Sequence, residues 1–289
     1  MTICEALVQG SAVLKNAGID TSSLDASVLL ANILNINRSS LIAKGKEILT
    51  EEKLSIFDLF IDRRKKGECI AYITGNKEFF GLNFTVNPTV LVPRPDTEIL
   101  VEASLEQIKT LNMANGTTDK IRVLDLCTGS GAVAISIKHE MPETEVWAAD
   151  LSEQALETAR ENSDRLLGAG SVNFFHGDLF NALPSENPSF SLIVSNPPYV
   201  PTDEIQTLSA EVQNEPFIAL DGGKSGLEII ERIINKSPDY IKQEGFLFLE
   251  ASPHQMKNIF PLLVNRGFKD IKLYKDLSRQ DRVIGGRYE

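Results

Sequence analysis

One stretch decides the fold of most of this chain: Val123-Leu124-Asp125-Leu126-Cys127-Thr128-Gly129-Ser130-Gly131, continued by Ala132–His139. Its apolar start predicts a buried strand, its two glycines a tight turn, and the residues that follow a helix. A ligand can approach the backbone of such a turn closely, and the beginning of the helix presents free N–H groups to it. The stretch therefore predicts one side of a binding site.

Short apolar runs alternate with amphipathic helical patterns from this stretch to the end of the chain. The runs are Ile121–Leu126, Glu145–Ala149, Ser171–Phe175, Phe190–Ser195, Gly245–Glu250, Asp270–Tyr274 and Arg282–Gly285. This alternation predicts an α/β, Rossmann-like sheet that is mostly parallel and binds ligands outside the carboxyl ends of its strands. The last two runs leave little room for a crossover helix, so we expect an antiparallel hairpin at the edge of the sheet.

Residues 1–75 differ from the rest and predict a small helical bundle. Apolar residues recur at helical spacing, Asp20-Thr21-Ser22-Ser23 can cap a second helix, and Thr50-Glu51-Glu52-Lys53 resembles a capping box that opens a third. Residues 76–92 change to aromatic and β-branched alternation, which predicts a β-hairpin that turns near Gly81 and links the two parts.

Residues 93–289 then form the second domain. Pro95 is well placed as the first residue of a helix that extends to about Thr110. The polar residues from Asn112 to Lys120 predict a flexible loop before the first strand of the sheet.

The net charge of −11 lies wholly in the larger part. Residues 1–75 hold 9 Lys+Arg and 9 Asp+Glu, which leaves 29 − 9 = 20 basic against 40 − 9 = 31 acidic residues. Proteins that grip nucleic acid show a basic face, so this balance argues against stable nucleic-acid binding. The one basic run, Arg63-Arg64-Lys65-Lys66, favours a solvated helix C-terminus, with a functional basic patch as the alternative.

No apolar run approaches the roughly 18 residues of a membrane span, and the first residues resemble neither a signal peptide nor a transit peptide. We therefore expect a cytoplasmic protein without a membrane partner. The 3 cysteines and 3 histidines show no zinc-site spacing, so we expect neither a metal nor a structural disulfide.

The residues Asn196-Pro197-Pro198-Tyr199, directly after the run Phe190–Ser195, suit methyl transfer to a planar nitrogen. Because the lone pair of an amide or amino NH2 is delocalised, the site must hold both N–H bonds. The Asn196 side-chain carbonyl and a neighbouring backbone carbonyl can accept them, the prolines fix φ, and the Tyr199 ring can cover the flat group. The alternative interpretation is a rigid stop after a strand.

Acidic residues follow three successive strands, where a ligand would lie. We predict that Asp125 and the turn Cys127–Gly131 face the methionine end of S-adenosylmethionine, that Asp150 and Leu151 face its ribose, and that Asp178 and Leu179 face its adenine. Singly, each Asp could instead form a cap or turn. The turn also satisfies the dinucleotide pattern G-x-G-x-x-G/A, so an NAD enzyme is the competing interpretation, although it gives Asn196–Tyr199 no role.

Together these features resemble the HemK/PrmC family of protein-glutamine N5-methyltransferases. Besides the glycine turn, Asp150 and Asn196–Tyr199, the resemblance rests on Ala71–Gly75, Glu78–Phe80, Leu91–Glu98, Glu215-Pro216 with Ala219-Leu220, Leu249-Glu250 with Gln255, and Asp281–Val283. It implies a class I S-adenosylmethionine-dependent methyltransferase fold and methylation of the Gly-Gly-Gln glutamine in class-1 peptide-chain release factors, which supports translation termination.

The resemblance also implies roles for particular segments. Residues 1–75 would dock the release factor, residues 76–92 would link the domains, and Asn196, Pro197, Pro198 and Tyr199 would clamp the glutamine and bind the cofactor through Asn196. We expect the segment Pro93–Glu98 to shape the cofactor or substrate pocket, with Arg94 as its substrate-binding residue, although a surface pair between Arg94 and Glu98 is an equal alternative. We expect a monomer.

Three positions depart from the family pattern. Cys127 replaces a common Gly, Leu179 replaces a Trp of some members, and Ala251-Ser252 stand where a Gly commonly follows Leu-Glu. Cys127 is tolerable if its backbone is not left-handed, and Leu179 can still pack against an adenine.

Two rival functions remain from the sequence. Adenine-N6 methylation of nucleic acid would use the same Asn-Pro-Pro-Tyr clamp on a flipped base. A non-catalytic module that binds S-adenosylmethionine would use the cofactor site alone.

Overall fold

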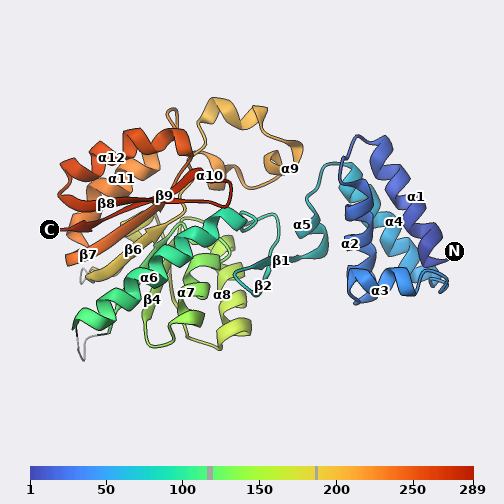
Figure 1. Cartoon of the computed structure of the whole chain (residues 1–289), viewed down its shortest axis with the longest axis horizontal. Helices are drawn as coiled ribbons and strands as arrows, with labels where there is room; N and C mark the ends of the chain where they lie inside the picture. The colour runs from blue at the N-terminus through green and yellow to red at the C-terminus, as the bar shows by residue number, and fades with distance from the viewer. Residues whose placement is uncertain (116–119, 186–187) are drawn as a thin grey trace. The chain divides into compact units, whose positions relative to one another are not determined.

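The predicted sheet is present in the computed structural model, which describes residues 1–115, 120–185 and 188–289 (Figure 1). Its strands are β3 (Arg122–Leu126), β4 (Glu145–Asp150), β5 (Asn173–His176), β6 (Phe190–Ser195), β7 (Ile241–Glu250), β8 (Phe268–Lys275) and β9 (Asp281–Tyr288). Their order is β5-β4-β3-β6-β7-β9-β8. The first five strands are parallel, whereas β9 runs antiparallel to both β7 and β8. The predicted edge hairpin is confirmed, and β9 is its inner strand.

The register of the parallel strands brings their carboxyl ends to one edge of the sheet. Leu126 of β3 pairs with Ala149 of β4 on one side and with Ser195 of β6 on the other. Ser195 in turn pairs with Leu249 of β7. The residues that directly follow these positions, Asp150, Asn196 and Glu250 among them, therefore lie at a common edge.

Helices cover both faces of the sheet, as an α/β fold requires. Helices α6 (Glu98–Asn115), α7 (Ala132–Glu140) and α8 (Glu153–Leu167) form one layer, and α11 (Glu228–Lys236) and α12 (Met256–Asn265) lie together on the other (Figure 1). Among the described helices, none is long and apolar enough to cross a membrane.

The predicted loop before β3 begins later than expected. Residues 112–115 continue helix α6, so the expectation of a flexible loop from Asn112 is wrong for these four residues. Residues 116–119 of the predicted loop lie outside the described residues. Pro95 begins a 3-10 turn, η1 (Pro95–Thr97), that leads directly into α6.

Short elements connect the strands and helices of the chain: η2 (Leu179–Ala182), η3 (Thr202–Thr207), α9 (Ala210–Gln213), α10 (Phe217–Leu220), η4 (Ser237–Asp239) and η5 (Pro253–Gln255). The hairpin is β1 (Asn76–Phe79) and β2 (Leu82–Thr85). Phe80 and Gly81 join its strands with φ of 50° and 74°, the positive values of the two-residue turns that hairpins favour.

The chain divides into two compact units, residues 1–76 with 209–214 and residues 77–208 with 215–289. The smaller unit contains α1 (Ile3–Asn16), α2 (Ser22–Leu34), α3 (Arg38–Ala43), α4 (Glu51–Lys65) and α5 (Ile70–Thr74). Its core includes Leu14, Leu29 and Phe57, which are fully buried. The predicted helical character of this region is confirmed.

The helix caps differ in part from the predictions. The Thr50 side chain accepts the Lys53 N–H, but Lys53 occupies the position that a capping box gives to Glu or Gln, so only half of the box forms. Thr21 caps α2 without a side-chain hydrogen bond. A complete capping box that was not predicted forms between Thr2 and Glu5 at the start of α1.

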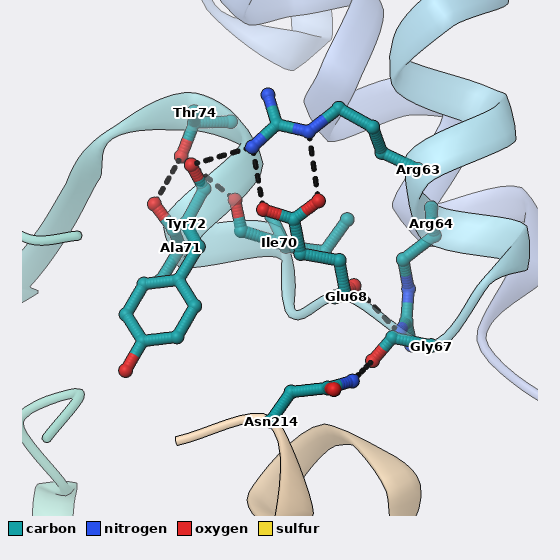
Figure 2. A network of polar contacts seen from close by, with 9 residues as sticks. All are labelled: Arg63, Arg64, Gly67, Glu68, Ile70, Ala71, Tyr72, Thr74 and Asn214. Atoms are coloured by element: carbon teal, nitrogen blue, oxygen red, sulfur yellow. Dashed lines mark hydrogen bonds and ion pairs between the residues drawn. The ribbon is translucent and has the colours of Figure 1, made fainter. Parts of the chain in front are cut away.

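The basic run at the end of α4 is solvated only in part. Lys65 and Lys66 are exposed, as predicted for a helix C-terminus, but the prediction is wrong for Arg63 and Arg64 (Figure 2). Arg63 Nε donates to Glu68 Oε2 at 2.7 Å. The Arg64 side chain is buried, and its Nε lies 2.7 Å from Asp25 Oδ2 of α2. These guanidinium groups reach acidic partners on other segments, which a pattern of consecutive residues does not reveal.

Arg64 also holds a distant segment in the same unit. Its second terminal nitrogen pairs with Glu211 of α9. Nearby, Asn214 Nδ2 donates to the Gly67 carbonyl at 3.1 Å (Figure 2). Residues 209–214 therefore belong to the helical unit although they follow Asn196–Tyr199 in the sequence.

Candidate active site

A cavity of about 400 Å³ lies where the carboxyl ends of β3, β4 and β6 meet. Most of the predicted site residues line it: Cys127, Gly129, Asp150, Leu151, Asp178, Leu179, Asn196 and Pro198. The register described above explains this convergence, because each of these residues ends a parallel strand or follows one closely. The sequence therefore placed the cavity correctly on the sheet.

A smaller cavity of about 50 Å³ shares part of this lining. It has Cys127, Gly129 and Asn196 in common with the larger cavity, and it adds Arg94, Asp125, Thr128 and Ser130. The remaining predicted residues, Gly131, Pro197 and Tyr199, are not among the residues that line either cavity.

The two glycines of the turn have different roles. A Cβ atom on Gly129, where φ is 56°, would meet no atom within 4 Å, so this residue leaves space for a ligand. A Cβ atom on Gly131 would lie 2.7 Å from Ile135 Cδ1 and 3.2 Å from Ala159 Cβ. Gly131 therefore permits α7 to begin close to α8, and its role is packing rather than direct binding.

Cys127 adopts a left-handed backbone, with φ of 60°. The cysteine was expected to be tolerated only if its backbone were not left-handed, and this condition is not met. A left-handed backbone costs a residue with a Cβ atom about 1–2 kcal/mol. Burial raises the pKa of its thiol, so the thiol stays neutral. Leu179, where φ is 50°, is a second strained residue at the cavity. Ser252 by contrast has an ordinary φ of −68° and caps η5 with its side chain.

We expect Cys127→Gly to raise the free energy of unfolding by up to about 1 kcal/mol, since glycine relieves the strain but gains more entropy on unfolding. Fluorescence of Trp147, the single tryptophan of the chain, can follow denaturation of the larger unit. Cys127→Ala is the matched control, because it removes the thiol and keeps the Cβ. Equal stabilisation by both variants would contradict the strain argument.

Two buried carboxyl groups shape the turn. Asp125 Oδ2 accepts hydrogen bonds from Thr128 Oγ1 at 2.6 Å and from the Ala134 N–H at 3.2 Å. Burial raises the pKa of Asp125 to about 7 in spite of these bonds. Asp150 accepts the N–H groups of Gly129 and Ser152 at 2.8 and 2.9 Å, and burial raises its pKa as well. Both residues thus fill the turn role that the sequence left open. Asp125 Oδ2 uses both of its lone pairs in these bonds, whereas each oxygen of Asp150 accepts one of them and keeps a lone pair for a ligand.

The far end of the larger cavity combines apolar and charged groups. Leu151 and Leu179 contribute apolar surface. Asp178 forms an ion pair with Arg232 of α11, and both side chains line the cavity. A flat, apolar ring with polar edges would fit such a lining.

Asn196 stands at the junction of the two cavities, and its amide orientation is fixed. Asn196 Nδ2 donates to Thr97 Oγ1 at 3.1 Å, so Oδ1 is the atom left to accept a hydrogen bond. The Tyr199 hydroxyl donates to Glu250 Oε1 at 3.4 Å, and burial raises the pKa of this hydroxyl. Gln255 Nε2 donates to the Tyr199 carbonyl at 2.9 Å. Both ends of Asn196–Tyr199 are therefore held by side chains from other elements.

Arg94 does not pair with Glu98, so that alternative is wrong. Arg94 pairs with the buried Glu215, and Glu98 Oε1 accepts the Phe80 N–H at 3.0 Å. Glu98 is thus used to hold the hairpin turn. Arg94 lines the smaller cavity beside Asn196.

Sequence reasoning did not assign several residues of the site. Phe217 and Ile218 line the larger cavity although their side chains are 57% and 49% exposed. Thr97, which also lines the smaller cavity, and Glu250 contact the Asn196–Tyr199 segment with their side chains. Glu250 could have been found by the rule that found Asp125 and Asp150, because it is a carboxylate at the end of an apolar strand. Phe217 and Ile218 give no comparable signal.

Two parts of the chain match known families. Residues 5–75 match the PrmC N-terminal domain, and residues 123–214 match a methyltransferase domain. Several relatives carry the name release factor glutamine methyltransferase. That of Clostridium botulinum is 38% identical over 288 residues, covering 99% of each chain. That of Neisseria gonorrhoeae is 40% identical over 266 residues, covering 92% of this chain and 93% of its own. That of Vibrio cholerae is 36% identical over 289 residues, covering 100% and 98%.

Solved structures share the fold at low sequence identity. The human METTL16 catalytic domain, in complex with the MAT2A 3'UTR hairpin 6, matches with a TM-score of 0.56 and 12% identity, covering 83% of each chain. Human methyltransferase 10 domain containing protein matches with a TM-score of 0.53 and 13% identity, covering 73% of this chain and 90% of its own. These likenesses show the architecture of the sheet and its helices.

Proposed function

Because the chain belongs to the family of release factor glutamine methyltransferases, we propose that it methylates N5 of the Gly-Gly-Gln glutamine in class-1 peptide-chain release factors. S-adenosylmethionine is the proposed methyl donor. The observation that carries the proposal is Asn196, which lines both cavities while its Nδ2 is committed to Thr97. A hydrogen-bond acceptor is thereby presented where a planar NH2 group must be held.

The residues of the larger cavity fit S-adenosylmethionine. Gly129 leaves open space beside the turn, and Asp150 has lone pairs for the two ribose hydroxyls. Leu151 and Leu179 can pack against the adenine ring. Asp125 and Asp150 place carboxyl groups at this end of the site, and a cationic donor would favour their ionised form against the effect of burial.

Asn196 and its neighbours would orient the glutamine amide. We assign Asn196 Oδ1 and the Pro197 carbonyl as acceptors of the two amide N–H bonds, and Tyr199 as the cover of the flat group. This arrangement turns the nitrogen lone pair out of the plane of its hydrogen bonds and toward the donor. Positioning of this kind can supply much of a rate enhancement, because it converts a two-body step into one within a single complex.

When bound, S-adenosylmethionine supplies a methyl carbon on a positive sulfur; the nitrogen–carbon bond forms, the carbon–sulfur electron pair returns to sulfur, and the nitrogen releases a proton to water. No base is needed before the attack, since the leaving group is already activated. The chain's own contribution is therefore to hold the amide and to exclude competing acceptors.

We assign the remaining parts of the chain in the same scheme. Residues 1–75 dock the release factor, residues 76–92 link the domains, and residues 93–289 carry the transferase site. The family match over residues 5–75 supports a dedicated substrate-docking part. Because release factors act on ribosomes, the cytoplasm is the proposed place of action.

Asp150→Asn is expected to weaken S-adenosylmethionine binding by about tenfold, because one acceptor oxygen for a ribose hydroxyl is lost. Isothermal titration calorimetry measures the change. Asp203→Asn in η3 is the matched control, since Asp203 is exposed and lies outside both cavities. Unchanged affinity in Asp150→Asn would contradict the assigned ribose contact.

Competition between substrates tests the proposed function against its rivals. Equal concentrations of a class-1 release factor and of adenine-containing DNA are incubated with the protein and S-adenosylmethionine carrying a labelled methyl group. We expect label in the release factor alone. Label in the DNA would support adenine methylation, and cofactor binding without label in either would support the non-catalytic alternative.

A further inference from the structure

Two buried residues behind the Asn196–Tyr199 segment contact both of its ends. Thr97, the last residue of η1, is 4% exposed, and its Oγ1 accepts the Asn196 Nδ2 hydrogen bond at 3.1 Å. Glu250, the last residue of β7, is 1% exposed, and its Oε1 accepts the Tyr199 hydroxyl at 3.4 Å. Thr97 and Glu250 therefore reach the proposed clamp from two elements that are far apart in the sequence.

The same two residues also contact each other. The Thr97 side chain lies beside the Glu250 carboxyl, where donation from its hydroxyl opposes the rise in the pKa of that carboxyl, and Glu250 Oε2 has no hydrogen-bond partner among the described residues. Asn196, Thr97 and Glu250 thus form a chain of neighbouring polar groups, in which the Thr97 hydroxyl can link the Asn196 amide to a buried carboxyl group. Tyr199 joins this chain directly at its Glu250 end.

The protonation state of Glu250 sets the direction of this chain. An ionised carboxylate can only accept, so the single Thr97 hydroxyl proton must point toward Glu250. Thr97 Oγ1 can then only accept from its other neighbour, which places Asn196 Nδ2 toward Thr97. Asn196 Oδ1 consequently faces away from Thr97, where it is available to the amide N–H of a substrate.

We propose that Thr97 and Glu250 are positioning residues for methyl transfer, which turn Asn196 Oδ1 toward the substrate amide and hold Tyr199 in place. This inference rests on the proposed function. It adds a reason why the Pro93–Glu98 segment and the end of β7 belong to the site. Neither residue has to touch the reacting atoms.

Protonation of Glu250 would reverse the chain. The protonated carboxyl can donate to Thr97 Oγ1, which frees the Thr97 proton to turn toward Asn196, where Oδ1 would accept it. Asn196 Nδ2 would face the substrate, and the acceptor would be lost. Burial raises the pKa of Glu250 to about 7, so this reversal falls within the range of an ordinary pH profile.

The charged groups that face Glu250 come from two other elements. Arg282 of β9 favours the ionised carboxylate, and Asp96 of η1 opposes it. Arg282 also pairs with Asp96 at 3.0 Å and with Asp276 at 3.1 Å. The pKa of Arg282 is raised, so its charge persists over the whole range of the profile.

The test measures kcat for release-factor methylation at saturating S-adenosylmethionine. Thr97→Val should lower kcat by about tenfold, the loss expected for one orienting hydrogen bond. Thr97→Ser keeps the hydroxyl and should stay within about twofold of wild type, whereas the Michaelis constant for the release factor should change in neither variant. Thr110→Val is the matched control, since Thr110 is exposed on α6.

The pH profile provides a readout that a purely structural role would not change. In the wild type, kcat should fall as the pH drops below about 7, because protonated Glu250 reverses the chain. Glu250→Gln has no carboxyl group at this position to titrate. Its kcat should therefore be lower than that of wild type at pH 8 and should not change with pH below that value. Asp125 also titrates near pH 7, but its ionisation should change the Michaelis constant for S-adenosylmethionine. Because kcat is measured at saturating S-adenosylmethionine, such a change does not affect it.

An acid limb that persists in Glu250→Gln would overturn the inference, as would a kcat of folded Thr97→Val equal to that of wild type. If Thr97→Val fails to fold, the comparison of wild type with Glu250→Gln decides. Wild type that does not methylate the release factor defeats the proposed function itself. If wild type methylates the release factor but either of the two overturning results is found, this inference alone is defeated.

Discussion

Asn196→Ala is expected to lower kcat for release-factor methylation by about 10²–10³-fold, the loss typical of a removed orienting group at the reacting atoms. The variant loses the Oδ1 acceptor that would hold one amide N–H, and the hydrogen bond from Asn196 Nδ2 to Thr97 disappears with it. Cofactor affinity should change by less than about threefold, since Asp150 and the glycine turn remain in place. Single-turnover kinetics and calorimetry measure the two quantities.

Asn235→Ala is the matched control for this variant. Asn235 is exposed on α11, and neither cavity includes it in its lining. Its replacement should leave both kcat and cofactor affinity unchanged. Normal turnover in Asn196→Ala would exclude the clamp, whereas a large loss of cofactor affinity would assign Asn196 to the cofactor instead.

Arg64→Ala is expected to destabilise the helical unit by about 3 kcal/mol, because it leaves a buried charge without its partner. The side chains of Arg64 and Asp25 are only 5% and 7% exposed. Glu211 is half-exposed and regains water when the pair breaks, so it adds little to the loss. Hydrogen exchange of the α2 and α4 amides measures the stability of this unit separately from the larger one.

Two further variants separate the buried charge from a simple loss of packing. Lys65→Ala removes an exposed cation from the next position of α4 and should change stability by less than about 0.5 kcal/mol. Arg64→Ala with Asp25→Ala removes both charges and should recover part of the loss. An Arg64→Ala variant as stable as Lys65→Ala would contradict the account of this ion pair.

Much of the fold could be predicted because its signals are local. An apolar run, a glycine turn and a helical pattern occur together around Gly129, and the parallel sheet follows from the repetition of such units. The strand ends then placed Asp150 and Asn196 at one cavity without knowledge of any contact. The positions of residues at the strand ends could therefore be predicted from the sequence.

The errors concern interactions between distant residues. Arg64 was interpreted as solvated because its buried partners, Asp25 and Glu211, lie on other helices. The left-handed backbone of Cys127 is set by the tight turn of the folded chain, and its residue type argues against that conformation. Thr97 was not singled out because its contact with Asn196 exists only in the folded chain, whereas Glu250 was missed although it ends an apolar strand as Asp150 does.

The most direct test of the central claim is tandem mass spectrometry of a purified class-1 release factor after incubation with this protein and S-adenosylmethionine. We expect one added methyl group, located on the side-chain nitrogen of the Gly-Gly-Gln glutamine. The Asn196→Ala protein should leave the same peptide unmodified. An unmodified glutamine with the wild-type protein, under conditions where cofactor binding is demonstrated, would contradict the account.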